Sequence, residues 1–580
     1  MFKNVLILCL LAGYISAQSF EWKTKFENSN FKETSNYDES IQYFKKIEKN
    51  SNYAKLFKLG VTPQGRDLFY FVVNKDKEFD LGKIKASKKS IVLIQNGIHA
   101  GEIEGKDACM LLLRDILITK DKEDLLDKVV IIIIPVINAD GHERISKYNR
   151  INQDGPLYMG WRTTAQNLNL NRDYLKADAP EIKAFIKLVN NVNPDIFIDT
   201  HTTDGLDMQP VITFAVEGQG TVPPVLSTWI QDTYNPFIEK FVTNKGFIIA
   251  PFVNLTDNGN PSKGMNNWVS SPKLSAGYMA IRNRVGVLIE THSLKPYKER
   301  VFSTLAFIEG TLNLANSSNT KIKQNSKLAD ELVKQKYGSL AELYPVGFKL
   351  TKDSVSFTWK GINAELKESI VAGGKVLKYN GEKYEKQIQF FPVLNPSKFA
   401  KVPKYYVIPQ EWETVIDILK LHGLNFEKIK NDTTVSAEQY KFKNVIFAEL
   451  PYEGRFQPTF DYETTIKTIP VNKGDYVFYT NQPLIGILIY LLEPNTNDSF
   501  LKWGFFNIIF EQKEYFEIYS MEPIAQKMYD ENSQLREEFN NKINSDEKFK
   551  NSIEARLNFF YEKSEYYDKK FNIYPVLKVY

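Results

Sequence analysis

Val129-Val-Ile-Ile-Ile-Ile-Pro-Val-Ile137 is the stretch that best indicates how this chain folds, because it is apolar throughout and rich in β-branched residues. β-branched side chains favour extended strands, and a strand that is covered on both faces has no polar side to alternate with. Such a run is therefore typical of a central strand in a sheet that has helices on both faces. We predict that it forms the middle of an α/β domain.

The sequence on either side of this run alternates further strand-like and helix-like segments from about residue 38 to about residue 320. The other predicted strands are Lys89–Gln95, Asp195–Asp199, Phe247–Pro251 and Val285–Glu290. The predicted helices are Glu39–Lys49, Gly105–Leu117, Ala179–Asn190 and Pro223–Lys240. This alternation is typical of an α/β fold with a mixed, mostly parallel β-sheet flanked by helices.

The pattern changes after the polar stretch Asn316–Ser326, which we take as the neighbourhood of a domain boundary. Short strand-like segments with turns follow to about residue 490, and charged, aromatic helix-like segments follow from there. We therefore predict a signal peptide at 1–17, a catalytic domain at 18–318, and a carboxyl-terminal accessory region at 319–580. The accessory region is expected to be β-rich first and helical at its end.

Composition and the first residues together indicate an exported protein. The 580 residues carry a formal net charge of only +4, which gives no reason to expect a nucleic-acid partner. Met1–Ala17 has the layout of a secretory signal peptide, a basic start followed by a short apolar run and Ser16-Ala17. Cleavage there leaves Cys109 as the remaining cysteine, so no intramolecular disulfide is expected. Residues 484–492 are too few to cross a bilayer, so no transmembrane segment is expected after cleavage.

Two of the 5 histidines stand at predicted strand ends, where metal ligands gather in α/β sheets. His99 and Glu102 lie in a turn between a predicted strand and a predicted helix, and His201 directly follows another predicted strand. Two imidazoles and one carboxylate leave the fourth position of a Zn²⁺ ion open, which is the catalytic arrangement. The structural alternative is that a buried histidine caps its strand and Glu102 only solvates it.

Glu290 ends an apolar strand, where partial burial should raise the pKa of its carboxyl group towards the range of a general base. An ordinary ion pair with Arg282 or Arg284 is the alternative. Asn171 and Arg172 place an amide and a guanidinium group side by side, a pair suited to binding a carboxylate.

Arg162 is a further candidate for catalysis, because a guanidinium group can stabilise the negative charge that develops on a carbonyl oxygen. It could equally stack on its neighbour Trp161. Neither the sequence around it nor its spacing decides between the two.

Six segments in a fixed order resemble the zinc metallocarboxypeptidases of the carboxypeptidase A type, over roughly residues 38 to 315. They are Thr62–Leu68, His99–Glu102, Asn138–Gly141, Leu170–Asp173, Asp199–His201 and Leu288–Glu290. The resemblance implies that His99, Glu102 and His201 bind one zinc ion and that Glu290 activates water. It also implies that Asn171 and Arg172 hold the terminal carboxylate of the substrate.

The sequence departs from that family at two positions. Many members carry an arginine shortly before the Asn-Arg pair to stabilise the oxyanion, and here Gln166 stands at the nearest matching position, so we assign the role to Arg162. Tyr278 is the candidate for the family's mobile, substrate-binding tyrosine, although it lies nearer to Glu290 than is usual.

The function that these residues favour is a secreted zinc carboxypeptidase acting on the carboxyl termini of peptides or proteins. An N-acyl amino acid deacylase of the succinylglutamate desuccinylase and aspartoacylase type is the first alternative, because it shares the segment Asp199-Thr-His201-Thr-Thr. An amidase of cell-wall peptides and a catalytically silent binding protein are the others. The sequence fixes neither the preferred terminal residue nor the oligomeric state.

Overall fold

The computed structural model describes residues 21–252, 254–257, 259–338 and 342–580. The predicted signal peptide at 1–17 lies outside the described residues. Within the described ranges, no helix combines the length and the apolar character that a membrane crossing requires.

The amino-terminal part of the chain is built on an eight-stranded sheet with the strand order β1-β2-β4-β3-β5-β9-β6-β7. The strands are β1 (Ala54–Val61), β2 (Asp67–Val73), β3 (Ser90–Gln95), β4 (Val129–Ile134), β5 (Ile196–Thr203), β6 (Ile212–Val216), β7 (Ile249–Pro251) and β9 (Val285–His292). The four central strands β4, β3, β5 and β9 are parallel, whereas β2 and β6 run antiparallel to their central neighbours. The predicted mixed, mostly parallel sheet is confirmed, and every residue of β4 is buried as its sequence indicates.

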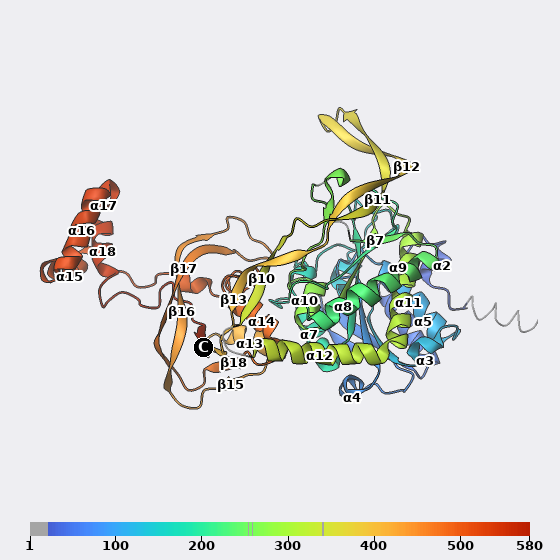
Figure 1. Cartoon of the computed structure of the whole chain (residues 1–580), viewed down its shortest axis with the longest axis horizontal. Helices are drawn as coiled ribbons and strands as arrows, with labels where there is room; N and C mark the ends of the chain where they lie inside the picture. Colours follow the sequence, from blue (N-terminus) through green and yellow to red (C-terminus); the bar gives the residue numbers. More distant parts are fainter. Residues whose placement is uncertain (1–20, 253, 258, 339–341) are drawn as a thin grey trace, which may run out of the picture.

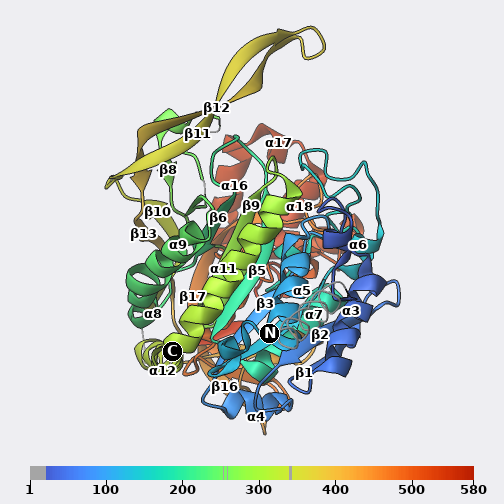
Figure 2. The ribbon, with the colours of Figure 1, turned by 90° about the vertical axis from the view of Figure 1, so that its right-hand side faces the viewer.

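Helices cover both faces of this sheet. They are α2 (Lys25–Asn28), α3 (Tyr37–Asn50), α4 (Leu81–Ala86), α5 (Glu104–Leu117), α6 (Ala139–Glu143), α7 (Pro180–Val192), α8 (Pro224–Trp229), α9 (Asn235–Asn244), α10 (Ser275–Ile281), α11 (Tyr297–Ser317) and α12 (Asn319–Tyr337). One apolar core joins the sheet to α3, α5, α9 and α11, of which α5 and α11 lie in front of the central strands in Figure 2. A second core lies on the other face and includes α7 and α10.

A buried ion pair fixes α11 against the start of α5, the helix that follows the predicted metal-binding turn. Arg300 Nη1 lies 2.7 Å from Glu104 Oε1, and both side chains are buried. Burial raises the pKa of Glu104, which Arg300 opposes. Removal of one member would leave the other charge buried without its partner, which is far more costly than the loss of a surface pair.

We expect Arg300→Met to lower the free energy of unfolding by about 3–5 kcal/mol, measured by urea denaturation. The double variant Glu104→Gln/Arg300→Met should recover part of that loss, because it no longer buries an unpaired carboxylate. Equal unfolding midpoints for the parent and Arg300→Met would show that the pair does not stabilise the fold.

The accessory region is β-rich and ends in helices, as predicted. Its strands are β10 (Leu343–Leu350), β11 (Val355–Ser369), β12 (Gly374–Phe391), β13 (Leu394–Lys401), β14 (Tyr405–Ile408), β15 (Glu427–Lys428), β16 (Thr433–Phe447), β17 (Pro458–Val471), β18 (Tyr476–Tyr479) and β19 (Leu577–Val579). Its helices are α13 (Glu413–Leu421), α14 (Ile485–Leu492), α15 (Ile518–Glu531), α16 (Ser533–Ser545), α17 (Glu547–Lys550) and α18 (Ile553–Tyr561). In Figure 1 the ribbon β11–β12 and the helices α15–α18 project from the rest of the molecule.

The two regions share a continuous apolar core. The core beneath α7 and α10 continues into β10, β14, β16, β18 and α14 of the accessory region. In addition, β12 pairs with β8 (Met265–Asn266), a short strand in the loop between β7 and α10. The accessory region is therefore packed against the eight-stranded sheet rather than joined to it by a linker alone.

The polar stretch 316–326, near which we predict a domain boundary, is mostly helical. It forms the end of α11 and the beginning of α12, and Ile322 and Asn325 are buried there. Asn319 is also buried, and its side-chain amide donates hydrogen bonds to the carbonyl oxygens of Lys88 and Lys128. A polar side chain of this stretch thus binds the backbone just before β3 and β4.

Candidate metal centre

His99 and Glu102 lie in the turn between β3 and α5. Gly97 has φ +64°, and a Cβ atom there would lie only 3.1 Å from Val136, so the turn requires glycine. The backbone N–H of Glu102 donates to the carbonyl oxygen of His99 at 2.8 Å, which closes the turn. The tight turn brings the imidazole and the carboxylate to the same side of the chain.

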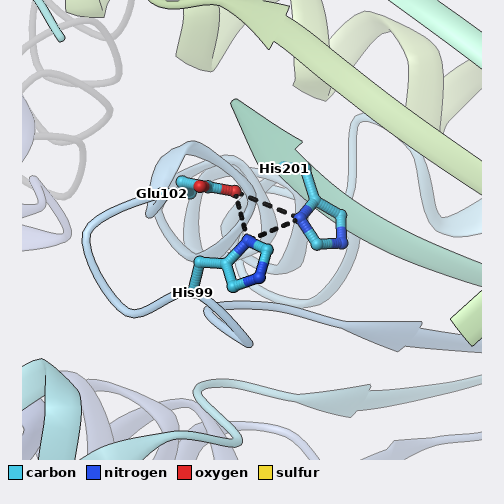
Figure 3. A group of neighbouring side chains, drawn as sticks. All are labelled: His99, Glu102 and His201. Atoms are coloured by element: carbon cyan, nitrogen blue, oxygen red, sulfur yellow. Dashed lines mark hydrogen bonds and ion pairs between the residues drawn. The ribbon is translucent and has the colours of Figure 1, made fainter. Parts of the chain in front are cut away.

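His201 lies in β5, which extends to Thr203 and is therefore longer than the predicted strand. β5 is the direct neighbour of β3, so His201 faces the turn that carries His99 and Glu102. Glu102 Oε2 is 3.1 Å from the Nδ1 atoms of both histidines, and the two Nδ1 atoms are 3.2 Å apart. Figure 3 shows these three side chains pointing at one another.

The three ligand atoms fit one zinc ion. Atoms bonded at about 2.0–2.1 Å to a tetrahedral ion lie about 3.3–3.4 Å from each other, close to the spacing found here. All three side chains are buried, and together they form a donor group of the kind that binds a metal ion. Two imidazoles and a carboxylate are also the donor set that zinc enzymes use when they keep one position open.

The outer nitrogen atoms of both histidines are fixed by hydrogen bonds. His201 Nε2 lies 2.7 Å from Asp199 Oδ2, and His99 Nε2 lies 3.1 Å from Asn169 Oδ1. These partners orient both rings so that Nδ1 faces the centre. Burial lowers the pKa of His99 to about 4, which keeps this imidazole neutral and able to bind a cation.

We expect Asp199→Asn to lower zinc affinity about 10- to 100-fold, because an amide holds the His201 ring less strongly than a carboxylate does. Competition with a chromogenic chelator measures the effect. Asp204→Asn, a substitution at an exposed position three residues from His201, is the matched control. Equal zinc affinities in the Asp199 variant and its control would contradict this role.

Glu290 lies in β9 directly beside His201, since the two residues are paired in the parallel register of β5 and β9. Its Oε2 atom is buried and has no hydrogen-bond partner among the described residues. Burial raises the pKa of Glu290 to about 8, and His201 opposes this rise. Burial thus moves the pKa of this carboxyl group in the direction that suits a general base.

Two arginines contact the other oxygen of Glu102. Arg150 Nη2 lies 2.6 Å and Arg162 Nη1 lies 3.2 Å from Glu102 Oε1. The guanidinium carbon of Arg144 lies 4.3 Å from the centre of the Trp161 ring. The Arg162 guanidinium group is instead turned towards Glu102. Sequence reasoning missed Arg150, which lies in an irregular loop with no recognisable spacing from the ligands.

Asn171 and Arg172 lie in a 3₁₀ turn, η2 (Leu170–Arg172), next to the metal centre. The link is Asn169 Oδ1, which contacts His99 Nε2 at 3.1 Å and accepts from the Asn171 N–H at 3.0 Å. Asn171 Oδ1 accepts from the backbone N–H of Ser275, and Arg172 Nη1 donates to the Asn171 carbonyl oxygen at 2.6 Å. The amide, the guanidinium group and the metal ligands are therefore held by one connected network.

Tyr278 does not lie among these residues. Its side chain is fully buried in α10, and its hydroxyl group contacts His422 Nδ1 at 2.9 Å and Arg282 Nη1 at 3.1 Å. A tyrosine held in this way cannot move to a substrate without breaking two buried hydrogen bonds. The position matches a packing role instead of the substrate-binding role predicted from sequence.

A cavity of about 420 Å³ lies beside this network. Its lining includes Leu288, which points to the same face of β9 as Glu290, and Ala276, the residue after Ser275. Phe214 and Trp268 add apolar surface, whereas the buried carboxyl group of Glu217 accepts from the backbone N–H groups of Ser270 and Gln219. The cavity is large enough for an amino-acid side chain.

Comparison with known proteins supports the family predicted from the six segments. A family model described as zinc carboxypeptidase matches residues 40–216, which include His99, Glu102, Asn171, Arg172 and His201 but not Glu290. Carboxypeptidase 2 of Trichophyton rubrum is 22% identical over 441 residues, which cover 72% of this chain and 74% of the fungal protein.

Two further proteins are similar to parts of this chain. The inactive metallocarboxypeptidase ecm14 of Schizosaccharomyces pombe is 28% identical over 163 residues, 27% of this chain and 30% of its own. Among solved structures, a metallo-carboxypeptidase from Burkholderia cenocepacia aligns at 17% identity with a TM-score of 0.36, covering 49% of this chain and 69% of that one.

Proposed function

We propose that this chain is an exported hydrolase that removes carboxyl-terminal residues from peptides, because residues 40–216 match a family model described as zinc carboxypeptidase. The observation that carries the proposal is that the Asn169 side chain joins the His99–Glu102–His201 centre to the Asn171–Arg172 pair. A peptide bound by its terminal carboxylate would therefore have its last peptide bond near the metal.

His99, Glu102 and His201 would hold one Zn²⁺ per chain. Zinc held by these residues would polarise the scissile carbonyl group and would lower the pKa of a bound water molecule to about 7. Glu290 is the general base that accepts a proton from the attacking water and passes it to the leaving amino group. Its buried Oε2 has no competing partner among the described residues and is thus available for that proton.

Arg162 is the residue that stabilises negative charge on the carbonyl oxygen. Its side chain is 42% exposed, so the guanidinium group can reach a substrate while remaining near Glu102. Asn171 and Arg172 bind the terminal carboxylate through charge-assisted hydrogen bonds. The side chain of the terminal residue occupies the cavity lined by Leu288 and Ala276.

Export follows from the layout of Met1–Ala17, with the catalytic domain at 18–318 and the accessory region at 319–580 in the mature chain. Peptides outside the cell are then the substrate class. Detection of the mature amino terminus near Gln18 in protein collected from the medium or periplasm tests this part of the proposal.

Matched peptides with free and amidated carboxyl termini test the activity. The zinc-loaded protein should release the last residue from the free acid, followed by mass spectrometry, and should cleave the amide at least about 100-fold more slowly because Arg172 loses its charged partner. Cleavage of N-acyl amino acids with all peptides left intact would favour the deacylase instead. No turnover of either class would favour a binding protein.

A further inference from the structure

A turn of the accessory region reaches the predicted substrate site. Tyr452 and Arg455, between β16 and β17, pair through both backbone hydrogen bonds, at 3.0 and 3.1 Å. Glu453 and Gly454 between them have φ +50° and +75°, the left-handed conformations of a two-residue hairpin turn. Glutamate is unusual at such a position, so the contacts of this turn with its surroundings must hold it there.

All three side chains of this turn contact the segment that carries Asn171 and Arg172. The Tyr452 hydroxyl group accepts a hydrogen bond from Arg172 Nε at 3.1 Å, and Glu453 Oε2 accepts from the Asn169 N–H at 2.9 Å. Arg455 forms a bidentate pair with Asp178 at 2.6 and 2.9 Å. The accessory region therefore helps to shape the carboxylate-binding end of the site.

Tyr452 is held firmly although it is 39% exposed. Its ring stacks on the fully buried Trp503, with centroids 5.7 Å apart and an interplanar angle of 14°. The Lys273 ammonium group lies within 6 Å of both rings and pairs with Asp498 at 3.3 Å. The phenol group is thus fixed beside Arg172 before any substrate binds.

The chemistry of this pair suits a carboxylate. The Tyr452 oxygen already accepts from Arg172, so its own O–H group remains available to donate. A carboxylate only accepts hydrogen bonds, and Arg172 Nη2 donates none within the described part of the chain. A terminal carboxylate placed here would receive one bond from the phenol and another from the guanidinium group.

We propose that Tyr452 of the accessory region is a substrate-binding residue, which donates its O–H group to the terminal carboxylate and orients Arg172. The inference rests on the proposed carboxypeptidase function. It also makes the accessory region part of the specificity for free carboxyl termini, so the catalytic domain alone does not contain the complete site.

The test compares 3-phenylpropanoate with 3-phenylpropanamide, two ligands that differ only in the carboxylate and carry no N-acyl amino acid bond, by calorimetric binding to the zinc-loaded protein. Their phenyl group suits the largely apolar cavity. Tyr452→Phe keeps the ring stacked on Trp503 and removes the donor, and Tyr515→Phe removes a hydroxyl group from another exposed tyrosine. Tyr452→Phe should lose about tenfold of the preference for the acid over the amide, and Tyr515→Phe should lose none.

The two ligands distinguish recognition from structural support. Equal weakening of acid and amide binding by Tyr452→Phe, an unchanged preference, or a parent that does not distinguish the two ligands would each overturn the inference. With Arg172→Lys, a double-mutant cycle should show that the two losses are not additive, because both groups bind one carboxylate. A parent that prefers the acid but hydrolyses no peptide would reject the proposed activity while supporting this binding role.

Discussion

Replacement of Glu290 by glutamine is expected to lower kcat for peptide hydrolysis about 10³-fold. Glutamine has nearly the same size and fits the same position beside His201, but its amide cannot accept the proton of the attacking water. The Michaelis constant should change little, because the carboxylate-binding residues Asn171 and Arg172 are untouched. Steady-state kinetics on the best-cleaved peptide, with zinc content measured on the same samples, gives both quantities.

The control for that variant is Glu181→Gln, which alters another buried glutamate. Glu181 lies in α7, and burial raises the pKa of its carboxyl group to about 7. It therefore resembles Glu290 in environment without lying at the metal centre. A Glu290→Gln protein that binds zinc normally and keeps more than a tenth of the parent kcat would exclude Glu290 as the base.

The second large effect is expected for His201→Ala, which removes one of three metal ligands and leaves Glu102 and His99 to hold the ion. We expect zinc to be lost during dialysis and peptide hydrolysis to fall to the uncatalysed background, a decrease of more than about 10⁴-fold. Added zinc should raise the melting temperature of the apo parent and have a much smaller effect on the variant.

His142→Gln separates loss of a ligand from loss of any buried histidine. His142 is buried, and its Nε2 and Nδ1 atoms contact Lys106 and Glu143 rather than the metal ligands. This control should keep its zinc and most of its activity. Retention of stoichiometric zinc by His201→Ala would contradict the proposed ligand set.

The sequence predicted the parts of the fold that depend on local patterns. The continuous apolar run at Val129 gave a central strand because a strand buried on both faces needs no polar residue. His99 and His201 were predicted to meet because parallel neighbouring strands end at the same edge of a sheet, and the structure brings their Nδ1 atoms to 3.2 Å. Strand-end position is a property that one sequence can reveal.

Other parts of the site depend on packing between distant segments, which local patterns do not encode. Arg150 reaches Glu102 from an irregular loop, and Tyr452 reaches Arg172 across 280 positions of the chain. Tyr278 was the candidate for the family's mobile tyrosine, although it lies nearer to Glu290 along the sequence than is usual. However, every residue of α10 is buried, so the sequence of that short helix gives no sign of which side faces the site.

The central claim is that one zinc ion is bound by His99, Glu102 and His201, and anomalous diffraction at the zinc absorption edge tests it most directly. Crystals of protein purified without chelators should give one strong peak, at about 2.0–2.2 Å from Nδ1 of both histidines and from a Glu102 carboxylate oxygen. A peak at other side chains, or a His201 imidazole beyond bonding distance of the ion, would contradict the account.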